Sequence, residues 1–169
     1  MALRFEEFME RHHDEISAYL WRLLNRQRDG SMDVDDLVQE VFMRAYRGFA
    51  RLHSSSNHRA WLYKIATNCA YTRLQQLRKR RDGLSSLRDS MTNGASAGNG
   101  ADDGKTQEQR VRGFVNNLPE KQRACVTLRY FQDLDYPEIA QILNCSQASA
   151  RANIYQAMRR LRALLREES

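Results

Sequence analysis

The sequence predicts an all-α fold in which two small helical domains are joined by a flexible linker. Apolar residues recur every three to four positions along most of the 169 residues, which is the period of an amphipathic helix. This pattern is interrupted once, in a glycine- and serine-rich stretch near residues 82–107. The chain also contains only two prolines and few β-branched runs, which favours helices over strands.

The first domain is predicted over residues 1–81 and contains three helices. The first begins at Phe5, the second follows a turn at 29–31 and an N-cap at Asp33, and the third covers about 59–81. Short loops join the helices, so their apolar faces can bury one core. The positions expected on these faces are Phe5, Phe8, Met9, His12, Ile16, Tyr19, Leu20, Leu23, Leu24, Val34, Leu37, Val38, Val41, Phe42, Ala45, Tyr46, Phe49, Leu62, Ile65, Ala66, Cys69, Ala70, Leu74 and Leu77.

Residues 82–107 are predicted to form the flexible linker. Leu84, Leu87 and Met91 are the only sizeable apolar side chains in this stretch. Such a composition cannot bury enough surface to offset the entropy of an ordered chain.

The second domain is predicted over residues 108–169. A short helix ends near Leu118, and Pro119 suits the first turn of the next helix, because its missing N–H would be unsatisfied there in any case. That helix is expected to end near residues 132–133. The expected apolar positions here are Val111, Phe114, Val115, Leu118, Val126, Leu128, Tyr130 and Phe131.

A helix-turn-helix motif is predicted over residues 136–151, within a DNA-binding domain that covers roughly residues 118–165. Asp135 and Glu138 fit a capping box at the start of its first helix. Asn144 ends that helix at a position that requires a left-handed backbone, and Ser146 caps the second helix. The expected buried positions are Ile139, Ala140, Ile142, Leu143, Cys145, Ala150, Ile154, Ala157, Met158, Leu161, Leu164 and Leu165.

The second helix of this motif carries a polar face that is suited to DNA. The N-terminal part of such a helix enters the major groove, where Gln and Asn pair with adenine edges and Arg pairs with guanine or phosphate. The residues expected on this face are Gln147, Ala148, Ser149, Arg151, Ala152, Asn153 and Gln156. The competing interpretation is a plain helical hairpin with a solvated polar face.

Two further faces lie in the first domain. The third helix combines Arg73 and the basic run 78–81 with the nearby Trp61, Lys64, Asn68 and Tyr71, and mixed basic and aromatic side chains are typical of single-stranded nucleic-acid binding. The second helix carries an acidic and mixed-charge face, for which a protein partner is plausible: Asp35, Asp36, Gln39, Glu40, Met43, Arg44 and Arg47. Ordinary solvated faces are the alternative for both.

Composition limits the remaining classes of function. The formal net charge of +6 indicates an anionic partner, either nucleic acid or a membrane surface. No apolar run is long enough to span a bilayer, and the N-terminal residues lack the pattern of a signal peptide. Cys69, Cys125 and Cys145 lack metal-ligand spacing and are expected to be reduced core residues of a cytoplasmic protein. We identify no enzyme active site, no metal site and no cofactor motif.

Four sequence motifs occur in a fixed order along the chain. The stretches 35–47, 60–68 and 118–123 and the helix-turn-helix resemble those of bacterial RNA polymerase sigma factors, most closely the extracytoplasmic-function (ECF) class of the sigma-70 family. The resemblance implies a region 2 bundle at 1–81 and a region 4 domain at 108–169. It also implies three partners: core RNA polymerase through its β′ clamp helices and β flap, promoter DNA, and an anti-sigma factor.

The resemblance assigns roles to the three faces. Core polymerase would be bound by Asp36, Gln39, Glu40, Met43, Arg44 and Arg47. The −10 element would be captured and melted by Leu52, Ser55, Asn57, Trp61, Lys64, Asn68 and Tyr71, with the phosphates held by Arg78, Lys79 and Arg80. The helix-turn-helix would read the −35 element.

The chain departs from the family pattern at three positions. Asn144 stands where glycine is usual, Ala150 where a β-branched residue is usual, and Asn153 where a basic residue is usual. The first two changes are compatible with the fold, whereas Asn153 and Gln147 put the usual upstream preference in doubt. The alternative function is a stand-alone helix-turn-helix regulator that dimerises through its N-terminal bundle, and an RNA-binding protein or a nucleic-acid enzyme comes third.

Overall fold

The computed structural model describes residues 4–24, 34–88 and 104–166, and every regular element in these ranges is helical. The predicted all-α class is therefore confirmed. The elements in chain order are α1 (Phe5–Leu24), α2 (Val34–Phe49), α3 (His58–Arg88), α4 (Gln107–Asn117), α5 (Glu120–Val126), the π-helical turn η1 (Thr127–Phe131), α6 (Tyr136–Ile142) and α7 (Gln147–Arg166). The predicted turn at 29–31, the Asp33 cap and Met91 lie outside the described residues.

Helices α1, α2 and α3 pack against one another through the predicted apolar faces. Ile16, Leu37 and Leu62 have no exposed surface, and Tyr19 is equally buried. The Tyr19 hydroxyl is hydrogen-bonded to the hydroxyl of Thr67 at 2.8 Å, so the polar tip of the tyrosine is satisfied inside the core.

Two expectations about this bundle were wrong. Tyr46 is 66% exposed rather than buried, because it lies at the edge of the apolar face and contacts only the rim of the core through Phe5. Helix α3 does not end near Arg81 but continues to Arg88. Leu84 and Leu87 are largely exposed in this extension, so burial does not explain it. Each residue added to an existing helix gains one backbone hydrogen bond without a new nucleation cost, which favours extension over starting a separate helix.

The C-terminal helices begin and end at the predicted signals. The capping box of Asp135 and Glu138 is present at the start of α6, and the Oγ of Ser146 accepts a hydrogen bond from the N–H of Ser149 at 3.1 Å. Asn144 has the predicted left-handed backbone, with φ = 49°. A second capping box, formed by Thr106 and Gln109 at the start of α4, was not predicted.

The helical segment after Pro119 ends at Phe131, close to the expected position, but its start and its last turn differ from the expectation. Pro119 is the N-cap of α5 rather than part of its first turn, and α5 passes into a π-helical turn in which the N–H of Gln132 donates to the carbonyl of Thr127 at 3.1 Å. The wider turn leaves Tyr130 and Phe131 about half exposed, although both were expected in the core. Leu164, near the end of α7, is also more exposed than expected, at 38%.

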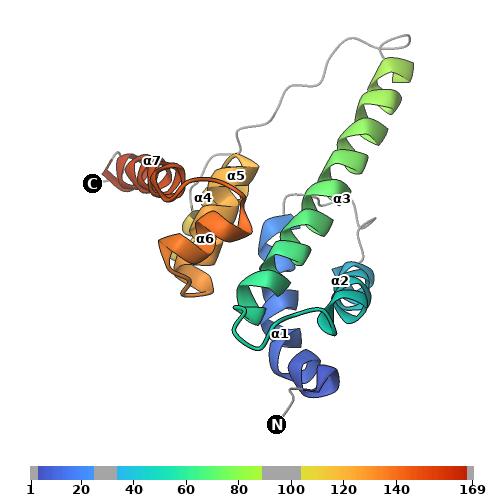
Figure 1. Cartoon of the computed structure of the whole chain (residues 1–169). Coiled ribbons are helices and arrows are strands. Elements are labelled where there is room, and N and C mark those ends of the chain that lie inside the picture. The colour runs from blue at the N-terminus through green and yellow to red at the C-terminus, as the bar shows by residue number, and fades with distance from the viewer. Residues whose placement is uncertain (1–3, 25–33, 89–103, 167–169) are drawn as a thin grey trace.

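The two groups of helices share one apolar core. Cys125, Leu128, Ile139 and Ile142 belong to the same cluster of buried side chains as the residues of α1, α2 and α3. Figure 1 shows α6 beside α3, with α7 on the side away from α2. Helix α3 is therefore packed against elements from both ends of the chain.

The left-handed backbone of Asn144 generates a stability prediction. We expect Asn144→Ala to lower the free energy of unfolding by about 1 kcal/mol, because a Cβ-bearing residue other than Asn is strained at this φ. Asn144→Gly should stay within about 0.5 kcal/mol of the parent chain. Urea unfolding measures both. Gln141→Ala, at an exposed position of α6, is the control, and an equal effect of Asn144→Ala and Gln141→Ala would contradict the prediction.

Candidate nucleic-acid and partner interfaces

The residues predicted to read DNA lie along the N-terminal half of α7. Most of them are exposed and two are half-buried, whereas Ala150, Ile154 and Ala157 are buried beneath them. The exposed members are Gln147, Ala148, Arg151, Ala152 and Gln156, and the half-buried members are Ser149 and Asn153. The helix therefore presents one continuous polar face away from its own core.

The Gln156 amide is held in one orientation. The buried Gln122 accepts a hydrogen bond from Arg160 at 3.2 Å, so its oxygen is identified, because an arginine can only donate. Its amide nitrogen then donates to the oxygen of Gln156 at 3.0 Å. Bidentate pairing with adenine needs both atoms of a glutamine amide. This bond uses one of the two lone pairs of the Gln156 oxygen, and the other lone pair and the amide N–H groups stay available to a base. The sequence did not indicate this contact.

Two other polar side chains of α7 also have partners. The amide of Asn153 donates to the carbonyl of Ser149 at 2.8 Å, one turn back on the same helix. The guanidinium carbon of Arg151 lies 4.9 Å from the centre of the Tyr136 ring. Tyr136 was not among the predicted site residues, since nothing in its spacing links it to α7.

The residues predicted to bind the −10 element are arranged along α3 and the loop before it. Lys64 and Asn68 are exposed one turn apart, and Trp61 is half-buried against α2. A Cβ added to Gly48 would lie 2.9 Å from the Trp61 ring, so glycine permits the close approach of this ring to the α2 backbone. Leu52 is half-buried and Ser55 is exposed in the loop.

Three of these residues line one cavity of about 470 Å³ between α3 and α5. Asn68, Tyr71 and Arg78 form its α3 wall, and Glu120 closes the opposite side. The Tyr71 hydroxyl is buried without a hydrogen-bond partner, and burial raises the pKa of this phenol above its usual value. Lys79 and Arg80 lie further along α3 and are exposed.

Two of the predicted nucleic-acid ligands are engaged by carboxylates of the C-terminal helices. Arg78 is paired with Glu120 of α5. The side-chain amide of Asn57 donates to Glu138 of α6 at 2.8 Å, while its oxygen accepts from the N–H of Ala60 at 3.0 Å and so caps α3. Both contacts place an anion of the C-terminal helices on a residue that was predicted to face DNA.

Most of the predicted partner face on α2 is exposed, although Glu40 is half-buried and lies 3.9 Å from Arg73 of α3. Asp36, Gln39, Met43 and Arg47 are exposed, with Met43 at 59%. Glu40 accepts a hydrogen bond from Arg44 at 2.6 Å, one turn further on the same helix. An apolar side chain surrounded by charges of both signs is typical of a protein interface.

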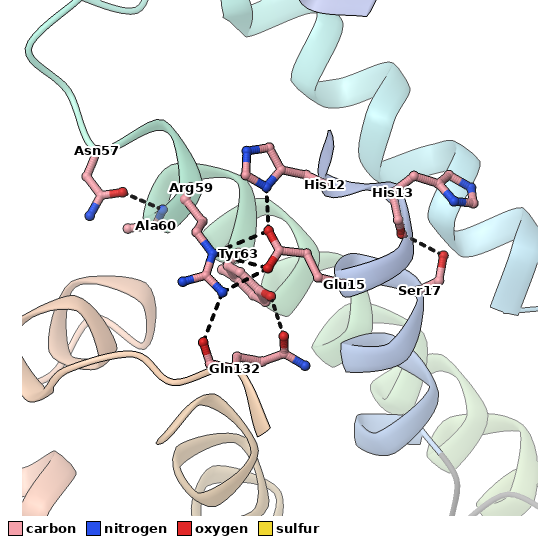
Figure 2. A network of polar contacts seen from close by, with 9 residues as sticks. All are labelled: His12, His13, Glu15, Ser17, Asn57, Arg59, Ala60, Tyr63 and Gln132. Carbon is pink, nitrogen blue, oxygen red and sulfur yellow. Dashed lines mark hydrogen bonds and ion pairs between the residues drawn. The ribbon is translucent and has the colours of Figure 1, made fainter. Parts of the chain in front are cut away.

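A polar network that the sequence did not indicate joins α1, α3 and the end of η1 (Figure 2). Arg59 donates to the carboxylate of Glu15 at 2.8 and 3.1 Å and to the backbone carbonyl of Gln132 at 2.9 Å. The hydroxyl of Tyr63 donates to the side chain of Gln132 at 2.7 Å. His12 contacts the same carboxylate of Glu15. Since Arg59 and Gln132 are far apart in the sequence, no local pattern could have predicted this contact.

The network changes the ionisation of Glu15. Burial disfavours the carboxylate, but hydrogen bonds from His12 and Arg59 outweigh it and lower the pKa of Glu15 from 4.5 to about 2. The hydrogen bond to Glu15 raises the pKa of Arg59. The pair therefore stays fully charged near neutral pH.

The described residues contain no group of three or more His, Cys, Asp or Glu side chains placed to hold a metal ion. None of the helices described is both long enough and apolar enough to cross a bilayer. Cys69 and Cys125 are buried, Cys145 is half-buried, and all three are free thiols. Burial raises the pKa of Cys125 to about 12, which keeps its thiol protonated.

Comparisons with known proteins match both groups of helices. The model of sigma-70 region 2 matches residues 8–81, and that of sigma-70 region 4 matches residues 108–161. The ECF RNA polymerase sigma-E factor of Haemophilus influenzae is 29% identical over 162 residues, which cover 90% of this chain and 82% of the relative. The sigma-E factor of Escherichia coli K12 is 32% identical over 136 residues, covering 75% and 71%.

A solved structure agrees with these matches. The sigma factor RpoE of Bartonella quintana, determined in complex with the anti-sigma factor NepR, superimposes with a TM-score of 0.72 at 25% identity and covers 96% of both chains. The chain thus belongs to the ECF class of the sigma-70 family, whose members direct promoter-specific transcription initiation by RNA polymerase.

The lowered pKa of Glu15 generates a pH-dependent prediction. We expect Glu15→Gln to lower the free energy of unfolding by about 1–2 kcal/mol at pH 7, after allowance for the partial exposure of Arg59. Because the pKa is depressed in the folded state, this contribution is present above pH 4.5 and is lost as the pH falls toward 2. Urea unfolding of both chains across this range should show their stabilities converging.

Glu10→Gln, at an exposed position on the same helix, is the matched control and should differ little from the parent chain. A stability difference for Glu15→Gln that is equally large at pH 7 and pH 2 would mean that the ion pair is not its cause.

Proposed function

We propose that this chain binds core RNA polymerase and selects promoters by a two-point grip, with residues 108–169 on the −35 element and residues 1–81 on the −10 element. The observation that carries this proposal is the presence of three separate faces on one chain, each of which includes exposed polar or charged side chains. These are the polar face of α7, the basic and aromatic face of α3, and the charged face of α2 around Met43. We assign the polar face of α7 and the basic and aromatic face of α3 to DNA. We assign the charged face of α2 to a protein partner.

In the proposed upstream contact, α7 enters the major groove of the −35 element. Its polar side chains lie on one exposed face over a buried apolar seam, which is the geometry of a recognition helix. Arg151 is the side chain best suited to guanine or phosphate, since its guanidinium is exposed and charged. Gln147 and Ser149 lie in the first turn, near the groove, and Ala148 and Ala152 supply apolar contact.

In the proposed downstream contact, α3 captures an unstacked base of the −10 element. Trp61 and Tyr71 offer aromatic surface for stacking, and Asn68 and Asn57 offer amides for base edges. The cations near the far end of the helix, Arg78, Lys79 and Arg80, would hold the phosphates of the opened strand. Leu52, Ser55 and Lys64 complete this surface.

In the arrangement described, part of this surface is occupied by the C-terminal helices. Glu138 holds Asn57, and Glu120 holds Arg78. Each carboxylate would have to be exchanged for a nucleic-acid group before these two residues contact DNA. We therefore propose that the two groups of helices separate when the chain engages polymerase and promoter.

The charged face of α2 is proposed to dock on the β′ clamp helices of core polymerase, while residues 108–169 contact the β flap. Asp36, Gln39 and Glu40 supply the acidic part of the face and Arg44 and Arg47 the basic part. This face lies on the opposite side of α2 from Leu37, Val41 and Ala45, so docking does not disturb the core.

A relative of this chain was determined with an anti-sigma factor, and we propose that this chain has such a partner too. A groove of about 800 Å³ between α1, α4 and η1 supports this, because residues of both groups of helices line it. Trp21 and Phe131, which are about half exposed, lie in its wall. The chain acts in the cytoplasm with polymerase, and it acts by binding rather than by catalysis.

A run-off transcription assay tests the function. The full chain is combined with sigma-free core polymerase of Escherichia coli and a template library randomised at the −35 and −10 positions. We expect transcripts from a defined subset of templates, and none from core polymerase alone. A chain that yields no promoter-specific transcript, but binds a palindrome by itself as a dimer, would instead be a stand-alone regulator.

The docking face generates a second prediction. We expect Asp36→Lys to weaken binding to core polymerase by at least tenfold, since it places a cation in the acidic part of the face. The folded state should lose no more than about 1 kcal/mol, because the change affects one charge in the first turn of a helix. Binding is measured by fluorescence anisotropy of the labelled chain.

Glu7→Lys makes the same change in the first turn of α1 and is the matched control. Equal affinities of Asp36→Lys and Glu7→Lys for core polymerase would place the docking face elsewhere.

A further inference from the structure

Tyr136 contacts two arginines of the C-terminal helices. It is the first residue of α6, directly after the N-cap Asp135, and its ring is half-buried against the apolar core. The guanidinium carbon of Arg151 lies 4.9 Å from the ring centre and that of Arg129 lies 5.1 Å from it. Tyr136 is therefore fixed by its helix and its packing, whereas Arg151 is an exposed side chain of α7.

The two arginines differ in what else they bind. Arg129 also donates to the carbonyl of Leu134 at 3.0 Å, so it is anchored inside its own segment. For Arg151, no carboxylate of the described residues lies within ion-pair distance. Its contact with the ring is thus the interaction that restrains it.

A contact of this kind leaves the hydrogen-bonding edge of an arginine available. The aromatic ring attracts the cation through its face, whereas the N–H donors lie in the plane of the guanidinium. A free arginine side chain loses considerable rotamer freedom when it binds, and a restrained one loses less. Restraint also limits the directions in which the donors point, which matters for the O6 and N7 atoms of guanine more than for a phosphate.

We propose that Tyr136 is a positioning residue that directs Arg151 toward a guanine of the −35 element and so sets the base preference at that position. This inference rests on the proposed function, because it requires α7 to be the recognition helix. Tyr136 itself contacts no DNA. It acts only through Arg151.

The test measures base preference in the intact holoenzyme. The full chain is assembled with sigma-free core polymerase, and run-off transcription is measured on templates in which each −35 position carries each of the four bases. The variants are Tyr136→Phe, Tyr136→Leu, Arg151→Ala and the double variant Tyr136→Leu/Arg151→Ala. Urea unfolding reports whether each variant is folded, and Tyr136→Met replaces Tyr136→Leu if the latter does not fold.

We expect Arg151→Ala to reduce the preference for one guanine by roughly 5- to 100-fold. Tyr136→Leu should reduce the preference at the same position by roughly 2- to 5-fold, the size of an exposed cation–π contact, and leave the other positions unchanged. Tyr136→Phe keeps the aromatic face and should retain the parent preference. The double variant should match Arg151→Ala, since Tyr136 has nothing left to position.

Three results would overturn the inference. One is a Tyr136→Leu chain whose transcription falls by the same factor on every template, because an unchanged base preference indicates a structural role only. Another is a double variant in which the two losses multiply, because the residues then act independently. The third is an Arg151→Ala chain with unchanged preference. Promoter-specific transcription by the parent chain tests the proposed function separately, so that function can hold while the role of Tyr136 fails.

Discussion

The packing of α3 against helices from both ends of the chain is the constraint on which the rest of the structure depends. Its buried side includes Leu62 and Ala66, which help to form the core of the N-terminal bundle, and Tyr63, which reaches Gln132 beyond η1. Its exposed side carries Lys64 and Asn68. One helix therefore supports the core, the contact between the two groups of helices and the proposed downstream promoter contact.

Few charged side chains join the two groups of helices directly. Arg59 is compensated by Glu15 inside the N-terminal bundle, and its remaining donor reaches only a backbone carbonyl of the other group. Of the side-chain pairs that join the two groups, Arg78 with Glu120 and Asn57 with Glu138 are at exposed positions, whereas Tyr63 with Gln132 is buried. Exposed pairs of this kind contribute little free energy, so the apolar surface accounts for most of the adhesion between the groups.

Local patterns in the sequence predicted the helices and several of their caps. The contacts that were not predicted join residues far apart in the sequence. The capping box at Asp135, the left-handed Asn144 and the cap at Ser146 each follow from residues within a few positions of one another, and all three are confirmed. The polar face of α7 follows equally from helical periodicity. The contacts of Arg59 with Gln132 and of Arg151 with Tyr136 join different elements, and periodicity carries no information about them.

Local sequence patterns also determine the ends of the helices only in part. The composition of residues 82–87 correctly indicates that they bury little, but it does not determine whether their backbone is helical, as α3 shows. The π-helical turn after α5 likewise has no signature among these local patterns, and the buried Leu128 and Leu134 lie within and just after it.

The contact between Asn57 and Glu138 joins two helix caps, and this has a consequence for reversibility. One oxygen of Glu138 accepts from the N–H of Asp135 to complete the cap of α6, and the other accepts from Asn57. Asn57 in turn caps α3 with its own oxygen. Each side chain would keep its capping bond if the two parted. The contact between Asn57 and Glu138 can therefore open and close reversibly while both helices keep their N-terminal caps.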